Sequence, residues 1–177
     1  NFLRFLELLT DERGLHISQR NITVSTCGIV ENMKRLADEK LQITLALSLH
    51  ASSQEKRKEL MPIAYKYELG DVLDACRYYF EKTGRRITFE YSLVGGVNDT
   101  PEHARMLVKH AKRVAAHVNL IPLNHVEESR FEPSTPEHLK AFIKILRDAG
   151  VNVTVRRKLG GDIDASCGQL RKKLAVR

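Results

Sequence analysis

The chain has 177 residues, of which 42% are hydrophobic, and its 29 Lys and Arg against 22 Asp and Glu give a formal net charge of +7. This length and hydrophobic content suffice for one sizeable core, so we expect residues 1–177 to form a single domain and exclude a disordered chain. No apolar run approaches the roughly 18 residues of a membrane-spanning helix, and no signal or transit peptide is evident, so a cytoplasmic protein is expected. The positive charge suits a polyanionic partner such as RNA, but it is also common in proteins that bind none.

The three cysteines exclude two kinds of small cysteine-rich protein. They lie at positions 27, 76 and 167, so they are odd in number and widely separated, and no pair forms C-x-x-C. Neither a disulfide framework nor a zinc site is therefore encoded. Cys76 lies among apolar neighbours in a stretch of helical periodicity, which indicates a core residue.

Along the chain, short apolar or β-branched runs alternate with stretches of helical periodicity. The pattern predicts helices over 2–9, 29–36, 57–60, 71–80, 101–114 and 136–149, and strands over 21–25, 42–48, 86–92, 118–121 and 151–155. Two of the helix starts carry a Thr-Pro-Glu sequence, at Thr100 and at Thr135. This order supplies an N-cap side chain, a Pro at the first helical position and an acid in the first turn.

Five strands that alternate with helices predict parallel βαβ units, and therefore an α/β fold. Both a segment of an α/β barrel and a doubly wound open sheet would show this alternation. The barrel is favoured because polar residues fall at or just past the C-terminal ends of successive strands, where barrel enzymes build their sites. These residues are Ser25, Ser48, His50, Glu90, Asn124 and Arg156.

The C-terminal segment 156–170 reads R-R-K-L-G-G-D-I-D-A-S-C-G-Q-L and lacks the periodicity of a buried element. Its Cys167 has the small neighbours Ser166 and Gly168, and the nearby cations favour the reactive thiolate. On composition alone, an ordinary loop with an incidental thiol is an equally good interpretation.

Several motifs occur together in one order along the chain. They are S-T-C-G at 25–28, A-L-S-L-H-A at 46–51, N-L-I-P-L-N at 119–124, V-R-R-K at 155–158 and D-I-D-A-S-C-G-Q-L at 162–170. Together they resemble the RlmN/Cfr family of radical S-adenosylmethionine (radical SAM) RNA methyltransferases. The resemblance implies that Cys167 is the catalytic cysteine, which is methylated and then passes the methyl carbon to adenine. It also implies that S-adenosylmethionine is bound by Ser25, Ser48, Leu49, His50 and Asn124.

The resemblance also implies a fold and a second cofactor. The chain matches the last four strands of the family's partial six-stranded (β/α)6 barrel and a C-terminal extension. Radical SAM enzymes hold a 4Fe-4S cluster on C-x-x-x-C-x-x-C, a motif that this sequence lacks. We therefore expect the cluster-binding strands and an N-terminal domain to lie upstream, where the family also places a general base and a second cysteine, and residues 1–177 to be inactive alone.

The partners implied are 23S rRNA and tRNA, methylated at C2 of adenine, and an electron donor of the flavodoxin type. Basic residues near Cys167 would contact phosphates. If the barrel's first two strands are missing from residues 1–177, the first strand here has an exposed edge, which is expected to pair with another chain and cause self-association.

Three other functions remain open from the sequence. A methyltransferase of the same family that acts on C8 of adenine and confers antibiotic resistance would share these motifs. A non-catalytic module that binds RNA or phosphate would explain the charge but not the segment around Cys167. A non-radical barrel enzyme could use Cys167 as nucleophile and His50 as base.

Overall fold

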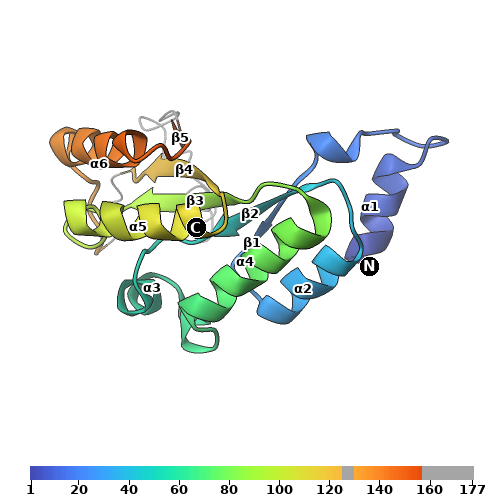
Figure 1. The fold of residues 1–177 in the computed structure, drawn as a ribbon, viewed down its shortest axis with the longest axis horizontal. Helices are drawn as coiled ribbons and strands as arrows, with labels where there is room; N and C mark the ends of the chain where they lie inside the picture. Colours follow the sequence, from blue (N-terminus) through green and yellow to red (C-terminus); the bar gives the residue numbers. More distant parts are fainter. Residues whose placement is uncertain (125–129, 157–177) are drawn as a thin grey trace, which may run out of the picture.

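The structure is a computed structural model that describes residues 1–124 and 130–156. Its centre is a five-stranded sheet in the order β1-β2-β3-β4-β5, with every neighbouring pair parallel (Figure 1). The strands are β1 Thr23–Thr26, β2 Thr44–Ser48, β3 Thr88–Leu93, β4 His117–Pro122 and β5 Val153–Val155. This confirms the α/β class and all five predicted strands. The strand order never reverses, whereas a doubly wound sheet reverses at a switch point, so the arrangement is that of a barrel segment.

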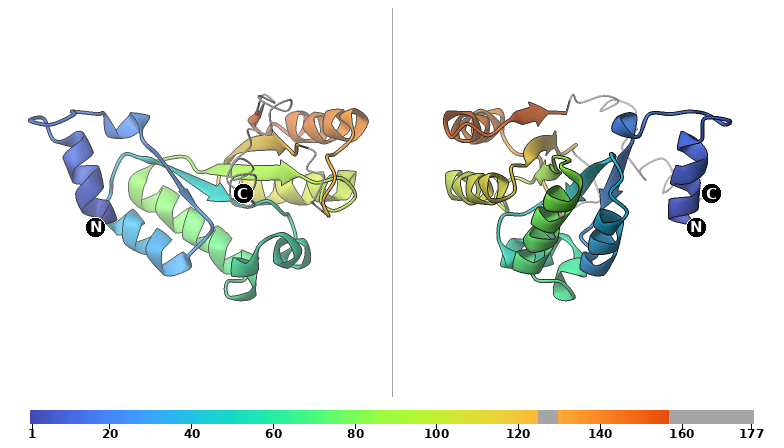
Figure 2. Two further views of the ribbon diagram at one scale, coloured as in Figure 1. Left: turned by 180° about the vertical axis from the view of Figure 1, so that it is seen from behind. Right: turned by 45° about the vertical axis from the view of Figure 1, so that its right-hand side comes forward.

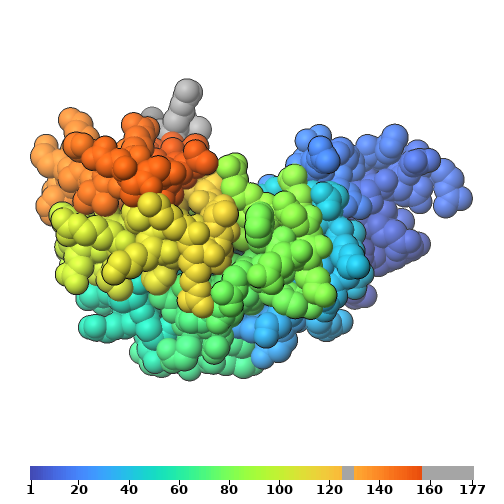
Figure 3. All heavy atoms as spheres, viewed as in Figure 1, coloured from blue at the N-terminus to red at the C-terminus, as the bar shows by residue number. Residues whose placement is uncertain are grey.

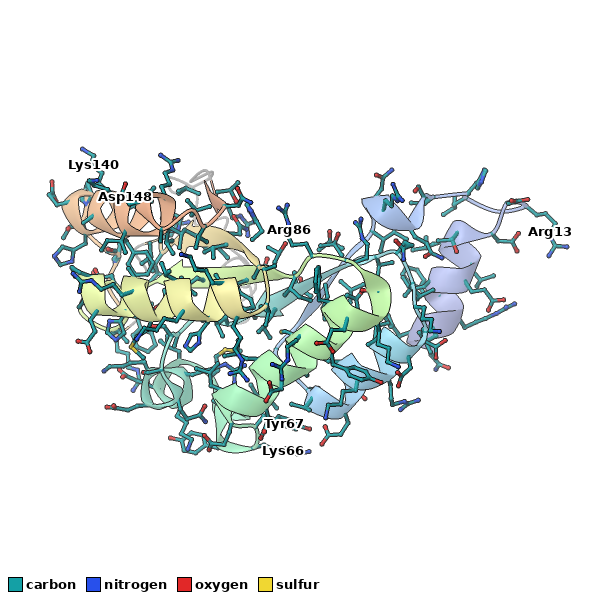
Figure 4. All side chains as sticks on the ribbon, viewed as in Figure 1. Arg13, Lys66, Tyr67, Arg86, Lys140 and Asp148 are labelled. Carbon is teal, nitrogen blue, oxygen red and sulfur yellow. The ribbon has the colours of Figure 1, made fainter. Side chains whose placement is uncertain are left out.

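In the part of the chain that the structure describes, six α-helices connect or flank the strands. They are α1 Phe2–Thr10, α2 Val30–Asp38, α3 Gln54–Leu60, α4 Leu69–Thr83, α5 Pro101–Arg113 and α6 Pro136–Asp148, and two 3-10 turns lie at Gln19–Asn21 and Pro62–Tyr65. Helices α2, α4, α5 and α6 follow one another along the same face of the sheet (Figures 1 and 2). Charged side chains such as Lys140 on α6 extend outward from this layer (Figure 4). Within the described residues, none of the helices combines the length and the apolar character that crossing a membrane requires.

The core lies between these helices and the sheet. In β3, Phe89, Tyr91 and Leu93 are fully buried, while the alternate residues are half-buried. The Tyr91 ring packs on Phe142 of α6 with a centroid separation of 5.5 Å. Since successive strand residues point to opposite faces, the buried set faces the helices and the polar set faces the other side of the sheet.

The helix starts follow the local sequence signals. The hydroxyls of Thr100 and Thr135 accept hydrogen bonds from the backbone N–H groups of His103 and His138, at 3.4 and 3.2 Å, and a Pro opens each helix. Helix α3 starts three residues before the predicted 57–60, because the hydroxyl of Ser53 caps it by accepting from Lys56 N at 3.2 Å.

Helix α1 stands beside the end of the sheet formed by β1, apart from the main helix layer (Figure 3). Only Leu6 of this helix is buried. Phe2 and Phe5 remain 45% and 54% exposed. A cavity of about 450 Å³ lies between α1, α2 and β1, and Val24 and Ser25 are among its lining residues. One edge of β1 therefore borders a partly apolar hollow.

Candidate cofactor-binding site at the strand ends

Strand β2 delivers three of the predicted site residues to one place. Ser48 is its last residue, Leu49 is fully buried and His50 has a left-handed backbone with φ of 54°. The backbone N–H groups of Leu49 and His50 both donate to the carbonyl of Glu90, at 3.0 and 3.1 Å. The turn after β2 is thus fastened to β3, which fixes where Ser48 and His50 point.

The placement of Glu90 at a strand end was wrong. Glu90 is the third residue of β3, with three more strand residues after it. The error has a simple cause, because neighbouring barrel strands are staggered: the register pairs Ser48, at the end of β2, with Glu90 inside β3. The Ser48 hydroxyl donates to Glu90 Oε2 at 3.4 Å.

The imidazole of His50 is held in one hydrogen-bonding role. Its Nδ1 accepts a hydrogen bond from the backbone N–H of Ser92 at 3.1 Å. Burial lowers the pKa of His50 to about 4, and the positive charge of Arg57 acts in the same direction. A neutral ring with an acceptor at Nδ1 carries its proton on Nε2, so His50 presents one N–H donor at this edge.

Asn98 holds the backbone of His50 in place through a hydrogen bond, a role that the sequence analysis missed. Its side chain is fully buried, and its amide nitrogen donates to the carbonyls of His50 and Ser92 at 2.7 and 2.8 Å. Its Oδ1 accepts from the N–H of Val94 at 2.8 Å, so the side chain is saturated. The stretch 95–99 predicts only a turn, since the bond from Asn98 to His50 crosses 48 residues of sequence and leaves no local signal.

Asp99 ties the same loop to α6. Its Oδ2 accepts from the hydroxyl of Ser134 at 2.7 Å and from Nδ1 of His138 at 3.0 Å, and its Oδ1 accepts from Gly96 N at 3.0 Å. Burial is the largest single influence on the pKa of Asp99 and raises it. The hydrogen bonds together have the greater effect, so the pKa is lowered overall. The carboxylate therefore stays ionised as a fixed anchor.

Ser25 lies on β1, beside β2, where the register pairs it with Ala46. The turn that follows, at Cys27 and Gly28, is held by a buried cation: Arg57 Nη2 of α3 donates to the carbonyl of Cys27 at 2.7 Å. Gly28 has φ of 97°, and a Cβ there would come within 3.1 Å of Arg57 Nη2. The S-T-C-G motif is thus shaped to accommodate Arg57, which the sequence analysis did not single out.

The remaining predicted residues are placed differently. Asn124 lies two residues past the end of β4 and is half-buried. Arg156 follows β5, and its N–H donates to the carbonyl of Leu120 at 2.8 Å. Cys167 lies outside the described residues. Cys76 is fully buried, which confirms it as a core residue, and burial raises the pKa of its thiol to about 12.

The edge therefore offers hydroxyl, imidazole N–H and amide groups at or just past the C-terminal ends of β1, β2 and β4. Across residues 1–124 and 130–156, no three His, Cys, Asp or Glu side chains are grouped so that they could hold a metal ion. Hydroxyl, neutral imidazole and amide groups suit a polar, largely uncharged ligand surface such as the ribose of S-adenosylmethionine. The donor set fits that cofactor.

Comparison with known proteins defines the class to which this fold and edge belong. No protein-family model matches the chain. A crystal structure of a radical SAM methyltransferase from Sphaerobacter thermophilus superposes with a TM-score of 0.88 at 43% identity, covering 95% of this chain and 49% of that one. A domain of pyruvate-formate lyase-activating enzyme from Bacteroides vulgatus, at 15% identity and a TM-score of 0.57, shares the fold. Along nearly its whole length, the chain is therefore similar to one half of a protein of the radical SAM methyltransferase class.

Curated relatives narrow this class to one family. A probable dual-specificity RNA methyltransferase RlmN from Clostridium perfringens is 55% identical over 172 residues, and one from Lachnospira eligens is 57% identical over 173 residues. These matches cover 97% and 98% of this chain but 50% and 49% of the relatives. The chain belongs to the RlmN family of radical SAM methyltransferases, and it spans about half the length of the curated relatives it matches.

Proposed function

We propose that this chain is part of a radical SAM RNA methyltransferase that methylates C2 of adenine in 23S rRNA and tRNA. The proposal rests on sequence identity: over 97% and 98% of its length, this chain is 55% and 57% identical to proteins named as dual-specificity RNA methyltransferases. Residues 1–177 would form one domain of that enzyme. With these RNA substrates and a flavodoxin-type electron donor, the enzyme would act in the cytoplasm.

Ser25, Ser48, Leu49, His50 and Asn124 are proposed to bind S-adenosylmethionine. Several features of the edge support this set: the turn after β2 is fixed to Glu90, His50 presents only its Nε2–H, and Arg57 holds the turn after Ser25. Leu49, which is fully buried, would act through its backbone. S-adenosylmethionine supplies a methyl group and, with a reduced 4Fe-4S cluster, radical chemistry. The chain has no C-x-x-x-C-x-x-C, so the cluster ligands would come from outside residues 1–177.

Cys167 is proposed to carry the methyl group. Its thiolate would take the methyl by displacement and hold it as a thioether until the carbon is joined to the base. A carrier on the protein makes chemical sense because adenine C2 is too weak a nucleophile for direct methyl transfer. The cations at 156–158 would favour the thiolate and contact RNA phosphates.

The test uses the full-length protein, meaning a polypeptide of the curated relatives' length that contains this chain. Mass spectrometry of protein purified from cells is expected to find one methyl group on Cys167, and nucleoside analysis of treated rRNA is expected to find 2-methyladenosine. A product of 8-methyladenosine would instead support the C8 enzyme. An unmodified Cys167 together with unmethylated RNA would refute the proposal.

A further inference from the structure

The face of the sheet opposite the helices carries a row of polar side chains. The strand register pairs Ser48 with Glu90, Glu90 with Asn119, and Asn119 with Thr154. Residues paired across parallel strands share a face and lie about 5 Å apart. One continuous line of side chains therefore crosses β2 to β5. Ser48, Glu90 and Asn119 are half-buried and Thr154 is exposed, whereas the residues next to them in β3 and β4 are fully buried under the helix layer.

Glu90 and Asn119 are neighbours in this row, and each can still form a hydrogen bond to a ligand. Thr154 donates to Asn119 Oδ1 at 3.1 Å, and its own hydroxyl oxygen lies 2.9 Å from His117 Nε2. Asn119 thus uses its carbonyl oxygen as an acceptor, and its amide nitrogen remains a donor. In the described part of the chain, the side chain of Glu90 accepts one hydrogen bond, the long one from Ser48 at 3.4 Å. Within residues 1–124 and 130–156, no cation forms a salt bridge with Glu90.

A carboxylate next to an amide donor matches one edge of adenine. The 6-amino group of adenine donates hydrogen bonds, and the ring nitrogens beside it, N1 and N7, accept them. Glu90 can accept from the amino group while Asn119 donates to the ring nitrogen. Glu90 is half-buried and has no cation partner among the described residues, so it also gains from such a donor, because burial removes water that would otherwise hydrogen-bond to its oxygens.

We propose that Glu90 and Asn119 form an adenine-binding site on the inner face of the barrel segment, with Glu90 on the 6-amino group and Asn119 on the adjacent ring nitrogen. The inference rests on the proposed function, in which both reactants carry adenine: S-adenosylmethionine and the target nucleotide of the RNA. The bond from Ser48 to Glu90 connects this pair directly to the proposed cofactor residues.

The experiment has two arms that separate these sources of adenine. In the first, calorimetry measures the dissociation constant of S-adenosylmethionine for the cluster-loaded full-length protein and for Glu90→Gln and Asn119→Asp. In the second, methylation is compared on two RNA hairpins that carry either adenosine or purine riboside, which lacks the 6-amino group, at the target position. Glu12→Gln and Asn152→Asp make the same changes at exposed positions outside the row and serve as controls.

If the site holds the cofactor, both variants should weaken S-adenosylmethionine binding by about 10- to 100-fold, with the controls unchanged. If it holds the target base, the wild type should prefer adenosine over purine riboside by about 10- to 100-fold, and Glu90→Gln should lose that preference. The inference is overturned if both quantities stay within about twofold of the controls in the two variants.

Two further readouts keep these conclusions separate. Circular dichroism and thermal melting show whether each variant is folded, and if Glu90→Gln does not fold, Asn119→Asp decides. Wild-type protein that binds S-adenosylmethionine but leaves every RNA unmethylated would refute the proposed function, while the binding comparison would still decide on Glu90 and Asn119.

Discussion

The surroundings of His50 hold its imidazole in one protonation state, with an acceptor at Nδ1 and a donor at Nε2. Its Nδ1 is occupied by the backbone of Ser92, and its carbonyl accepts the amide of the buried Asn98. A protonated ring would place a donor at both nitrogens and lose the bond from Ser92. Burial and the nearby Arg57 cation both disfavour that charged form.

We therefore expect the His50 imidazole to titrate with a pKa of about 4, below the ordinary value of 6.5. Between pH 4 and 6.5 the imidazole binds a proton in the unfolded chain but not in the folded chain. The stability that comes from burying neutral His50 is therefore complete above pH 6.5 and is lost as the pH falls towards 4. NMR titration of the histidine resonances measures the pKa. Urea unfolding of His50→Asn, which keeps an acceptor near Nδ1, should show a weaker dependence on pH in this window. A His50 resonance that titrates near 6.5 would contradict the assignment.

Replacement of Cys167 by Ala should separate function from stability. In the full-length protein it is expected to abolish RNA methylation while leaving folding, cluster binding and cofactor binding largely intact, because a residue between Ser and Gly contributes little packing. If Ser48 and Asn124 bind S-adenosylmethionine as proposed, Ser48→Ala and Asn124→Ala would each remove a cofactor hydrogen bond worth about 0.5–1.5 kcal/mol, or about 1.5–3 with a charged partner, and should only weaken activity. Cys167→Ala enzyme that still methylates RNA at a tenth of the normal rate would show that the sulfur is not the methyl carrier.

At the scale of elements, periodicity and capping signals predicted the five strands and the helix starts at Thr100 and Thr135. Both kinds of signal are local, so the sequence contains them. The predicted strand 21–25 is β1 Thr23–Thr26, and 151–155 is β5 Val153–Val155, since strand ends depend on where the neighbouring strand offers a partner. The predicted helix 57–60 is shorter than α3, because the residues of α3, QEKRKEL, carry no apolar stripe that would indicate where the helix begins.

The contacts that position the candidate site were less predictable. Arg57 reaches Cys27 across 30 residues and Asn98 reaches His50 across 48 residues. Ser48 and His50 could be found from a strand end alone, but the stagger that brings Glu90 beside Ser48 requires the register of the sheet.

The contact between α3 and the turn after β1 gives a prediction at this scale. Gly28→Ala should destabilise the full-length protein by roughly 1–3 kcal/mol, because φ of 97° strains any side chain and the new Cβ would meet both Arg57 Nη2 and Val72 Cγ1 at 3.1 Å. Gly84→Ala imposes a positive φ of 65° in open space, so it separates backbone strain from crowding.

Gly70→Ala is the matched control. Gly70 lies in α4, and a Cβ there would meet no atom within 4 Å, so the change should be neutral or stabilise the protein by up to about 1 kcal/mol. Urea unfolding of the three variants should rank Gly28→Ala as the least stable. Equal effects of Gly28→Ala and Gly84→Ala would mean that contact with Arg57 contributes nothing.

For the whole molecule, the sequence of residues 1–177 sets a limit on cofactor chemistry. Because it has three widely separated cysteines and no C-x-x-x-C-x-x-C, a polypeptide of these residues alone is expected to bind no 4Fe-4S cluster and to have no methyltransferase activity. Anaerobic reconstitution followed by iron and sulfide analysis checks this. Stoichiometric iron and sulfide with a visible charge-transfer band would contradict it.

The same polypeptide is expected to self-associate through β1. This strand ends the described sheet, pairs only with β2, and borders the cavity between α1 and α2, so its outer edge offers unpaired backbone groups beside an apolar hollow. Light scattering over a range of concentrations should show a mass that rises above the monomer. Val24→Lys places a charge on that edge and should shift the protein towards monomer, whereas Leu15→Lys removes a 70% exposed apolar side chain elsewhere and should not. A monomer at high concentration, or dissociation by Leu15→Lys alone, would show that β1 is not the contact.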